Sequence, residues 1–430
     1  MKATRGRGGN IFHAHLIAFF IFTFLFLIEC CLADESSVPP PLRLTDLIPE
    51  VLKCNPKLAS ARSNSEAASH VIPRVQTLSD PQLSIMSEDT PFKSGSELMP
   101  MIRYQISQMF PFPGKLALRG KIAEQGLEIA RSEESMTIRD LILQTKRLYY
   151  ELYLNQAARR INEQNRVLIR RFVDGALIRY KAGKGEYAEV LKAQIEFQML
   201  ENEMLTLQNE RALVASMLNA LLDRPANAPV GEPVEEFSPP KSFNYEALVQ
   251  TAMQQCSELK GMQAMIMEKK SMAAMARRDF YPDFMISAQY QQITKGGDDA
   301  WGVGVGMNLP IWINRKQKRE AAEAEARAMA AESTLEGMRA MIRSQIQGAL
   351  VKLQTTESRL TLYKTSLIPA TIQTLDAGEA RYRAGMGDFL MLLDTQRQLK
   401  AMELDYERSR MEREQLLADL ERATCGAFPE

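Results

Sequence analysis

The sequence predicts a mainly α-helical protein with a small β part, in which one supersecondary unit is used twice. Arg179–Tyr187 and Arg381–Phe389 share the pattern R-Y-(K/R)-A-G-x-G-(D/E)-(Y/F), about two hundred residues apart. Helix-forming residues dominate 114–222 and 314–424 with almost no proline, which favours long coiled-coil hairpins. Short alternations of apolar and polar residues precede both stretches and indicate β-strands.

The composition is ordinary for a folded protein. The chain has 430 residues, of which 45% are apolar and 25% are charged. This length favours two or three domains. The formal net charge is zero, so no nucleic acid partner is expected.

Residues 1–33 have the features of a secretory signal peptide. Basic residues within Lys2–Arg7 precede an uncharged apolar stretch, and small residues precede a cleavage site after Ala33. Two alternatives stay open: an uncleaved N-terminal anchor, and a lipid attached to Cys30 or Cys31. All three place the remainder outside the cytoplasm. Beyond the signal no long uncharged apolar run follows, so no transmembrane helix is expected in the mature chain.

Each repeat is expected to contain helix, two antiparallel strands, long helix, tip and long helix. The first repeat, 34–224, is predicted to begin with a helix over 44–79 that is broken near Asn55–Pro56. Strands within 82–86 and 102–110 follow. A helix from 115 to about Phe172 and a helix ending at Leu222 complete the repeat. The second repeat, 244–425, is predicted to contain a helix over Tyr245–Arg278, strands within 281–291 and 302–309, a long helix to the second tip, and a last helix ending near Cys425. A proline-rich linker, 225–243, separates them.

The two repeated motifs are predicted to be hairpin tips. In each, two glycines follow a helical pattern, and an acidic residue then precedes a new apolar period. This order is typical of a helix end, a tight turn and a new helix with an anion at its N-terminus.

Four strands with one apolar and one polar or glycine-rich face are typical of transmembrane β-structure. A small soluble sheet packed on a core is the alternative. In lipid, four strands cannot form a closed barrel and open edges are not tolerated, so several copies would have to share one barrel. Three copies would provide twelve strands, and a twelve-stranded barrel leaves room for a duct.

The whole pattern resembles the TolC-like outer membrane efflux proteins, including the exit ducts of cation and drug pumps. The resemblance rests on Asn55-Pro56-x-Leu58, the strand-to-helix junction Gln108–Lys115, the two R-Y-x-A-G tips and the element order. It covers essentially the whole mature chain. It implies a homotrimer in the outer membrane, with a twelve-stranded barrel and a periplasmic helical tube. The implied partners are a periplasmic adaptor protein, an inner-membrane pump and the lipid bilayer.

The resemblance also implies where the duct is gated. In the family, acidic rings just past the second tip narrow the periplasmic entrance, and Asp394 matches one of them. The other ring position holds Met391, and the comparable positions of the first repeat are Glu189 and Lys192. The entrance would therefore carry mixed charge. The residues expected at the adaptor-contacting tips are Arg179, Tyr180, Gly183, Gly185, Arg381, Tyr382, Gly385 and Gly387.

No catalytic set is evident, and neither an enzyme nor a cofactor is expected. The mature chain has one histidine, His70, which excludes a multi-histidine zinc site. Methionines crowd the helix around 253–275, where packing and binding of a soft metal such as Cu(I) are both open. Cys54, Cys256 and Cys425 are expected to be buried free thiols, although a disulfide remains open.

The function predicted from these observations is a passive exit duct of a tripartite efflux system, gated at its tips and opened by an adaptor. A same-fold alternative is the outer-membrane component of a type I protein secretion system. An alternative of another class is a periplasmic coiled-coil scaffold without a channel. The transported substrate stays open.

Overall fold

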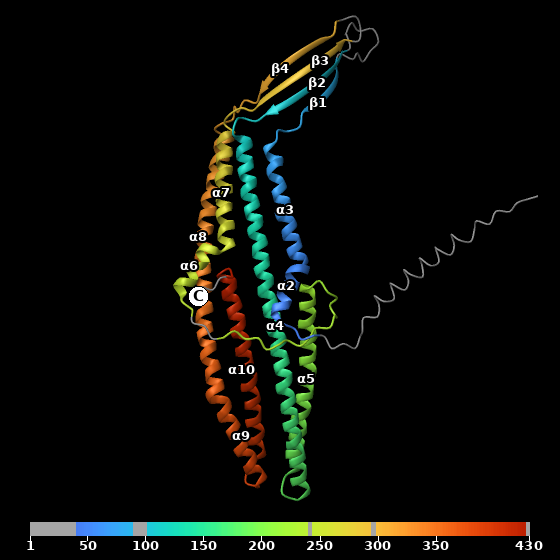
Figure 1. Cartoon of the computed structure of the whole chain (residues 1–430), viewed down its shortest axis with the longest axis vertical. Helices are drawn as coiled ribbons and strands as arrows, with labels where there is room; N and C mark the ends of the chain where they lie inside the picture. The colour runs from blue at the N-terminus through green and yellow to red at the C-terminus, as the bar shows by residue number, and fades with distance from the viewer. Residues whose placement is uncertain (1–39, 89–100, 240–242, 294–297, 427–430) are drawn as a thin grey trace, which may run out of the picture.

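A computed structural model describes residues 40–88, 101–239, 243–293 and 298–426. The molecule is a long bundle of helices with a sheet at one end and two hairpin tips at the other (Figure 1). The predicted class, mainly helical with four strands, is confirmed. The expected signal peptide (1–33) lies outside the described residues. None of the helices in the described ranges combines the length and the apolar character needed to cross a bilayer.

The first repeat follows the predicted element order. Its elements are α2 (Leu44–Cys54), α3 (Pro56–Gln76), β1 (Gln82–Glu88), β2 (Met101–Phe110), α4 (Lys115–Lys181) and α5 (Tyr187–Leu221). The predicted break at Asn55 is confirmed. The Asn55 side chain caps α3 by accepting a 2.9 Å hydrogen bond from the Lys57 backbone N–H, and Pro56 occupies the first helical turn.

The second repeat has the same order, and its long helices match those of the first in position. Its elements are α6 (Tyr245–Gln255), α7 (Ser257–Arg278), β3 (Phe284–Ile293), β4 (Ala300–Met307), α8 (Gln317–Leu362), the π-helical turn η1 (Tyr363–Leu367), α9 (Ile368–Arg383) and α10 (Phe389–Ala423). Gln317 lies 202 positions after Lys115, and Phe389 lies 202 positions after Tyr187. Residues 202 apart are therefore counterparts.

Three helix boundaries differ from the predictions. α4 continues past Phe172 to Lys181, because the following turns remain amphipathic and bury Ala176. The predicted single helix 245–278 is interrupted at Cys256, whose extended backbone matches that of its counterpart region at Asn55. The long helix that leads to the second tip contains the π-helical turn η1, which ends two residues before Pro369, where the missing proline N–H interrupts the regular hydrogen-bond ladder.

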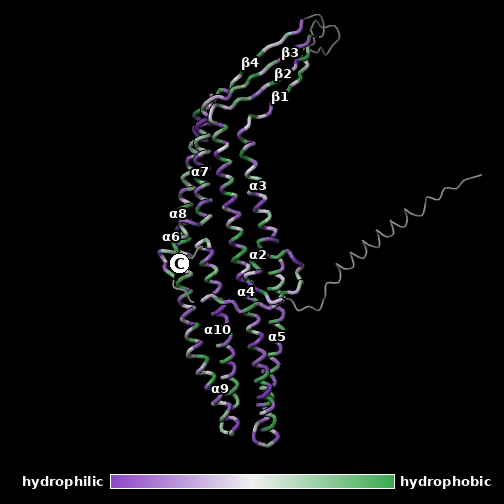
Figure 2. The backbone as a smooth tube through the Cα atoms, viewed as in Figure 1, coloured by the Kyte–Doolittle hydropathy of each residue, from purple (hydrophilic) through white to green (hydrophobic). Residues whose placement is uncertain are grey.

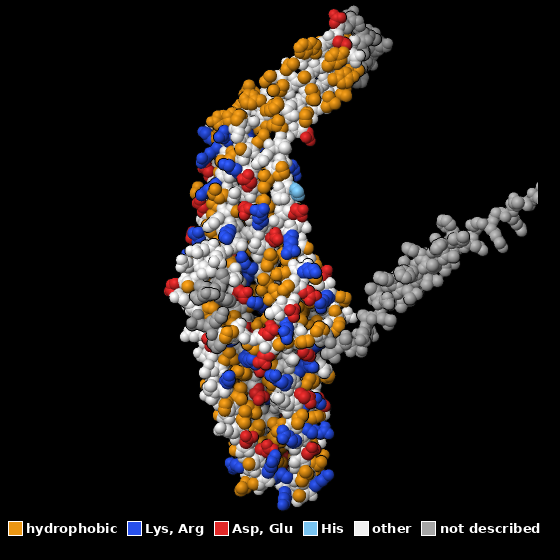
Figure 3. Space-filling view, in the orientation of Figure 1, with side chains coloured by type: hydrophobic (Ala, Val, Ile, Leu, Met, Phe, Trp, Pro, Cys, Tyr) orange, Lys and Arg blue, Asp and Glu red, His pale blue; other side chains and the backbone are white. Residues whose placement is uncertain are grey.

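The sheet is antiparallel in the order β1-β2-β3-β4, and its register places the predicted apolar residues on one face. One cross-strand row runs through Ile85, Tyr104, Tyr290 and Trp301. These side chains are exposed in the single chain. Hydropathy alternates along the strands (Figure 2), and hydrophobic side chains gather on the sheet while charged ones are scattered over the helices (Figure 3). The described part of the sheet thus has an exposed apolar face.

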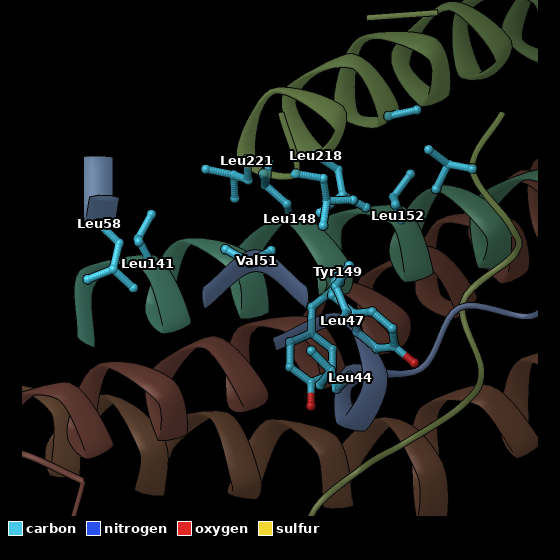
Figure 4. Packing of buried hydrophobic residues seen from close by; sticks show 14 residues of the cluster. Leu44, Leu47, Val51, Leu58, Leu141, Leu148, Tyr149, Leu152, Leu218 and Leu221 are labelled. Carbon is cyan, nitrogen blue, oxygen red and sulfur yellow. The ribbon is translucent and has the colours of Figure 1, made fainter. Parts of the chain in front are cut away.

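The helical bundle is held by three clusters of buried apolar residues. One lies at the waist where α2, α4 and α5 meet, and Figure 4 shows Leu47, Tyr149 and Leu218 within it. A second lies at the tips, and a third joins α6, α7, α8 and α10. Each fully buried Leu or Phe side chain contributes about 1.5–3 kcal/mol, so these clusters fix how the two hairpins lie against each other.

The linker between the repeats packs closely against the bundle at the waist. It forms a parallel bridge between Leu42 and Pro233, and the Tyr149 hydroxyl donates a 2.6 Å hydrogen bond to the Val234 carbonyl. Further along, the Arg410 guanidinium lies 3.9 Å from the centroid of the Phe237 ring. The described part of the linker is therefore anchored to helices of both repeats.

The expectation of three buried free thiols is wrong. Cys256 and Cys425 form a disulfide that joins the α6–α7 break to the end of α10, and Cys54 is free and exposed. The two halves of this disulfide are 169 residues apart in sequence. The bond closes a loop that includes β3, β4 and the whole second hairpin.

We predict that peptide mapping of the non-reduced mature protein recovers Cys256 and Cys425 in one linked peptide pair. Cys54 should react with maleimide without reduction, because it is exposed. Closing a loop of this length stabilises a fold by up to about 5 kcal/mol, so the variant Cys256→Ser should denature at a lower temperature than Cys54→Ser. A maleimide-reactive Cys425 in the non-reduced protein would contradict the pairing.

Candidate functional site at the helical tips

Both tips are tight turns that need glycine. Gly183 and Gly385 have φ angles of +69° and +79°, a region that residues with a side chain rarely adopt. In the first turn the Lys184 N–H donates to the Arg179 carbonyl at 2.9 Å, and the second turn repeats this bond with Met386 and Arg381 at 3.0 Å. These bonds satisfy the last carbonyls of α4 and α9. The predicted helix end, turn and new helix are confirmed at both motifs.

The second glycine of the second tip is required by close packing. A Cβ atom on Gly387 would lie 2.6 Å from the Tyr382 backbone nitrogen. After this glycine, the Asp388 side chain accepts a 2.9 Å hydrogen bond from the Leu390 N–H and caps α10. The first tip is less tight, because a Cβ on Gly185 would meet Arg179 Cβ at 3.2 Å.

The two tips touch through Arg179, Tyr382 and Glu189, which we call the tip contact. The Arg179 guanidinium lies 4.5 Å from the Tyr382 ring centroid and donates a 2.5 Å hydrogen bond to the Tyr382 carbonyl. The Tyr382 hydroxyl donates to Glu189 Oε2 at 2.8 Å. Burial, and then the neighbouring Glu189 carboxylate, raise the pKa of the Tyr382 hydroxyl, which therefore remains a donor. Sequence reasoning had selected all three residues but had not paired them.

Above the tip contact, two more glutamates of α5 bind the second hairpin. Glu189, Glu196 and Glu203 are seven residues apart, so they lie along one side of the helix. Arg397 Nε donates to Glu196 Oε2 at 2.9 Å, and Lys400 forms an ion pair with Glu203. We call these three carboxylates and their partners the glutamate seam. Sequence reasoning missed it, although the heptad spacing of the glutamates was a readable signal.

The seam lies beside an apolar contact between the hairpins. It combines side chains of α4, α5, α9 and α10, and its most buried members are Ile169, Ala176, Val190, Ala193, Leu200, Phe389 and Leu392. This packing fixes the positions of the charged groups, because the side chains interdigitate.

The predicted gate residues do not form one cluster. Glu189 belongs to the tip contact, whereas Lys192 is exposed on α5. Asp394 is exposed on α10, and its nearest cation is Arg397 at 3.8 Å. An exposed pair of this kind contributes about 0–1 kcal/mol. The Asp394 carboxylate thus contributes little to the stability of the fold, and its charge is available to act on ions at the entrance.

The two tip tyrosines have different surroundings. Tyr382 is buried in the tip contact, whereas its counterpart Tyr180 is exposed and touches the Tyr187 ring at 5.1 Å. Arg381, the counterpart of Arg179, is exposed as well. In the second motif, Tyr382 therefore contacts the first hairpin, whereas Arg381 is exposed and available to other surfaces.

One group of candidate metal ligands lies among the described residues: Cys256, Glu258 and Cys425. Its two sulfurs are joined in the disulfide, so they are not available as the thiolates that a soft metal needs. In the methionine-rich α7, Met262 packs against the cluster of α6, α7, α8 and α10, as does Met253 of α6. Packing accounts for these two methionines, and we assign no metal site to them.

An elongated helical bundle that ends in a two-faced sheet and two hairpin tips defines the class of outer-membrane channel proteins with a periplasmic extension. The sequence profile described as "Outer membrane efflux protein" matches residues 47–223 and 248–426. The chain belongs to this family, whose members are channels rather than enzymes.

The chain is also similar to individual known proteins. The cobalt-zinc-cadmium resistance protein CzcC of Cupriavidus metallidurans is 20% identical over 371 residues, which are 85% of this chain and 86% of that protein. The outer membrane protein VceC of Vibrio cholerae has a similar fold, with a TM-score of 0.76, 19% identity and coverage of 90% and 97% of the two chains. The CmeC outer membrane channel of Campylobacter jejuni also has a similar fold, with a TM-score of 0.77 and 14% sequence identity. The match covers 90% of this chain and 86% of that chain.

We predict that Gly387→Ala disrupts the second tip. Overpacking of this kind costs about 1–3 kcal/mol, so trypsin should cut at Arg381 or Arg383 about tenfold faster. Gly337→Ala is the matched control, because a Cβ there has open space. Equal cleavage rates in both variants would show that the close approach at Gly387 does not constrain the tip.

Proposed function

We propose that this protein is the exit duct of a tripartite efflux system and that its periplasmic entrance is closed by the tip contact. The observation that carries the proposal is the engagement of Arg179, Tyr382 and Glu189 between the two hairpins at the far end from the sheet. The contact is small and polar, so a partner that binds the tips can compete for it. The waist cluster and the cluster of α6, α7, α8 and α10 contain no residue of the tip contact, so they remain intact when it breaks.

The assembled duct is a homotrimer. Support comes from the sheet, whose edge strands β1 and β4 leave backbone groups unpaired in the single chain. Lipid does not tolerate such edges. Pairing β4 of one copy with β1 of the next gives twelve strands from three copies, with the row of Tyr104 and Trp301 facing lipid and the glycine face of β4 facing the lumen.

Opening moves the second hairpin away from the first at the tips. A periplasmic adaptor protein binds the exposed tip residues, and an inner-membrane pump supplies the energy. The π-helical turn η1 lies between α8 and α9, where a local change of the hydrogen-bond ladder lets α9 move without disturbing α8. The disulfide and the anchored linker hold the upper end of α10 in place meanwhile.

The entrance carries charges of both signs at the proposed gate residues Asp394, Glu189 and Lys192. Glu189 is engaged by Tyr382, so the free charges are those of Asp394 and Lys192. Because the name of the relative CzcC refers to cobalt, zinc and cadmium, these divalent cations are the first cargo to test. The outer component of a type I protein secretion system remains the same-fold alternative.

The proposal is tested with the purified mature protein in planar bilayers. A trimeric duct should require detergent for extraction and give discrete conductance steps. A periplasmic scaffold would be released by salt alone and give no current, and that result would refute the duct. Accumulation of cobalt, zinc or cadmium in cells lacking the protein separates metal export from protein secretion.

We predict that Asp394→Ala raises the conductance of the closed state and lowers its preference for cations. Removal of three carboxylates, one from each copy, widens the entrance and reduces the local negative potential. The fold should be unaffected, because the Asp394–Arg397 pair is exposed. Asp376→Ala on α9 is the matched control. An unchanged current and selectivity in Asp394→Ala would remove this residue from the gate.

A further inference from the structure

The Cys256–Cys425 disulfide lies where the first repeat has a hydrogen bond. The helices before the strands are offset by 201 residues, so Asn55, between α2 and α3, corresponds to Cys256, between α6 and α7. Asn55 Nδ2 donates a buried 2.9 Å hydrogen bond to the Leu221 carbonyl. Cys256 Sγ lies 3.6 Å from the carbonyl of Ala423, the counterpart of Leu221. Both repeats therefore connect the helix break to the end of the helix that returns from the tip, and the second does so with sulfur.

The backbone, rather than the disulfide, sets the positions of both cysteines. Cys425 has a φ angle of +64°, and its counterpart Asp223 has a φ angle of +54°. Residues with a Cβ rarely adopt this region, so its recurrence at both helix ends identifies it as a property of the fold. The extended backbone of Cys256 likewise recurs at Asn55. The two sulfurs therefore remain close together when the bond between them is reduced.

Glu258, in the first turn of α7, brings a carboxylate to the two sulfurs. Its Oε2 atom lies 3.3 Å from Cys425 Sγ, and one ligand atom from each of Cys256, Glu258 and Cys425 lies within 4.8 Å of the others. Arg422 forms an ion pair with the other oxygen, Oε1. Arg139 Nη1 is 4.0 Å from Oε2, which is beyond hydrogen-bonding distance. Oε2 is thus positioned to act as a ligand.

The surroundings stabilise negative charge on the sulfurs. Cys256 is the N-cap of α7, where the free backbone N–H groups carry partial positive charge. Two guanidinium groups lie nearby and are held in place. Arg422 Nε donates to Asp140 Oδ1 at 2.6 Å, and Arg139 Nη2 donates to the Ser257 hydroxyl at 3.1 Å. A helix N-terminus and neighbouring arginines are features that favour thiolates.

We propose that the reduced cysteine pair binds one thiophilic divalent cation, such as Zn²⁺ or Cd²⁺, through Cys256 Sγ, Cys425 Sγ and Glu258 Oε2. Thiolate and carboxylate are ligands that zinc takes in proteins, and three protein ligands leave the fourth position of a tetrahedral ion for water. The two thiolates and the carboxylate carry three negative charges. The divalent cation and the Arg422 guanidinium together balance them.

The oxidised and metal-bound states exchange by ordinary thiol chemistry. A dithiol reductant gives two electrons and two protons to the disulfide and itself becomes a disulfide, which leaves thiols on Cys256 and Cys425. The cation then displaces both thiol protons. The end of α10 lies beside α6 and α7 (Figure 1), and either the covalent bond or the metal connects them. This inference goes beyond the proposed function and does not depend on it.

Cadmium titration tests the site directly. The assembled mature protein, in a Cys54→Ser background, is reduced with a phosphine, desalted without oxygen and titrated with Cd²⁺. The thiolate-to-cadmium absorption band is followed in the ultraviolet. We expect the band to saturate at one Cd²⁺ per chain in the reduced protein and to be absent from the oxidised protein. A reduced protein without the band, or an unchanged band in Cys425→Ser, would overturn the proposal.

Glu258→Gln tests the carboxylate. This change retains the size of the side chain and both thiols, so the band should persist while the Cd²⁺ dissociation constant rises about tenfold or more. Glu268→Gln on the same helix is the matched control, because Glu268 pairs with Lys269 at 2.9 Å and lies about three turns away. Equal dissociation constants for the Glu258→Gln and Glu268→Gln variants would overturn the three-ligand assignment.

Maleimide protection provides a test that needs no variant. In the reduced wild-type protein, one equivalent of Cd²⁺ should slow the modification of Cys425 about tenfold or more. The exposed Cys54 should react at the same rate with and without the ion. An unprotected Cys425, or equal protection of Cys54, would overturn the proposal. Neither readout uses conductance, so a protein that binds cadmium but never conducts refutes the duct and retains the metal site.

Discussion

Three glutamates at heptad spacing on α5 hold the two hairpins of this chain in register. Seven residues are about two helical turns, so Glu189, Glu196 and Glu203 lie along one side and meet groups of the second hairpin in order. The apolar cluster beside them supplies most of the adhesion, because burial of apolar surface is the larger energetic effect and exposed ion pairs contribute little. The glutamates determine which residues of α9 and α10 lie opposite α5, and hence that Tyr382 is the buried tyrosine.

The duplicated architecture explains how two hairpins can be alike in backbone and unlike in side chains. The backbone of the second repeat follows the first at an offset of 202 residues, and the turns have the same hydrogen bonds. The side chains have diverged at the faces that meet a neighbour. Charged pairs occur where the two hairpins meet, and aromatic or apolar residues such as Tyr180, Tyr187 and Met391 are exposed elsewhere on the tips.

Much of the fold could be predicted from the sequence because its signals are local. Glycines at positive φ fixed both tips, Pro56 fixed the break before α3, and strict alternation marked the strands and their apolar face. The pairing of β2 with β3, which places Tyr104 beside Tyr290, was not predicted. It was harder to predict which residues contact each other across the fold. Both motifs contain Arg-Tyr, and nothing local distinguishes the buried Tyr382 from the exposed Tyr180. The Cys256–Cys425 disulfide joins positions whose proximity depends on the packing of α6, α7 and α10, and the break at Cys256 has no proline to mark it.

The central claim is that the contact between Tyr382 and Glu189 keeps the entrance closed. A double-mutant cycle of Tyr382→Phe and Glu189→Ala, read as single-channel open probability in planar bilayers, tests it most directly. Each single change should raise the open probability, and the double change should raise it no further than Glu189→Ala alone. That outcome corresponds to a coupling of about 1 kcal/mol or more. Two effects that multiply independently, or no effect of either change, would contradict the account.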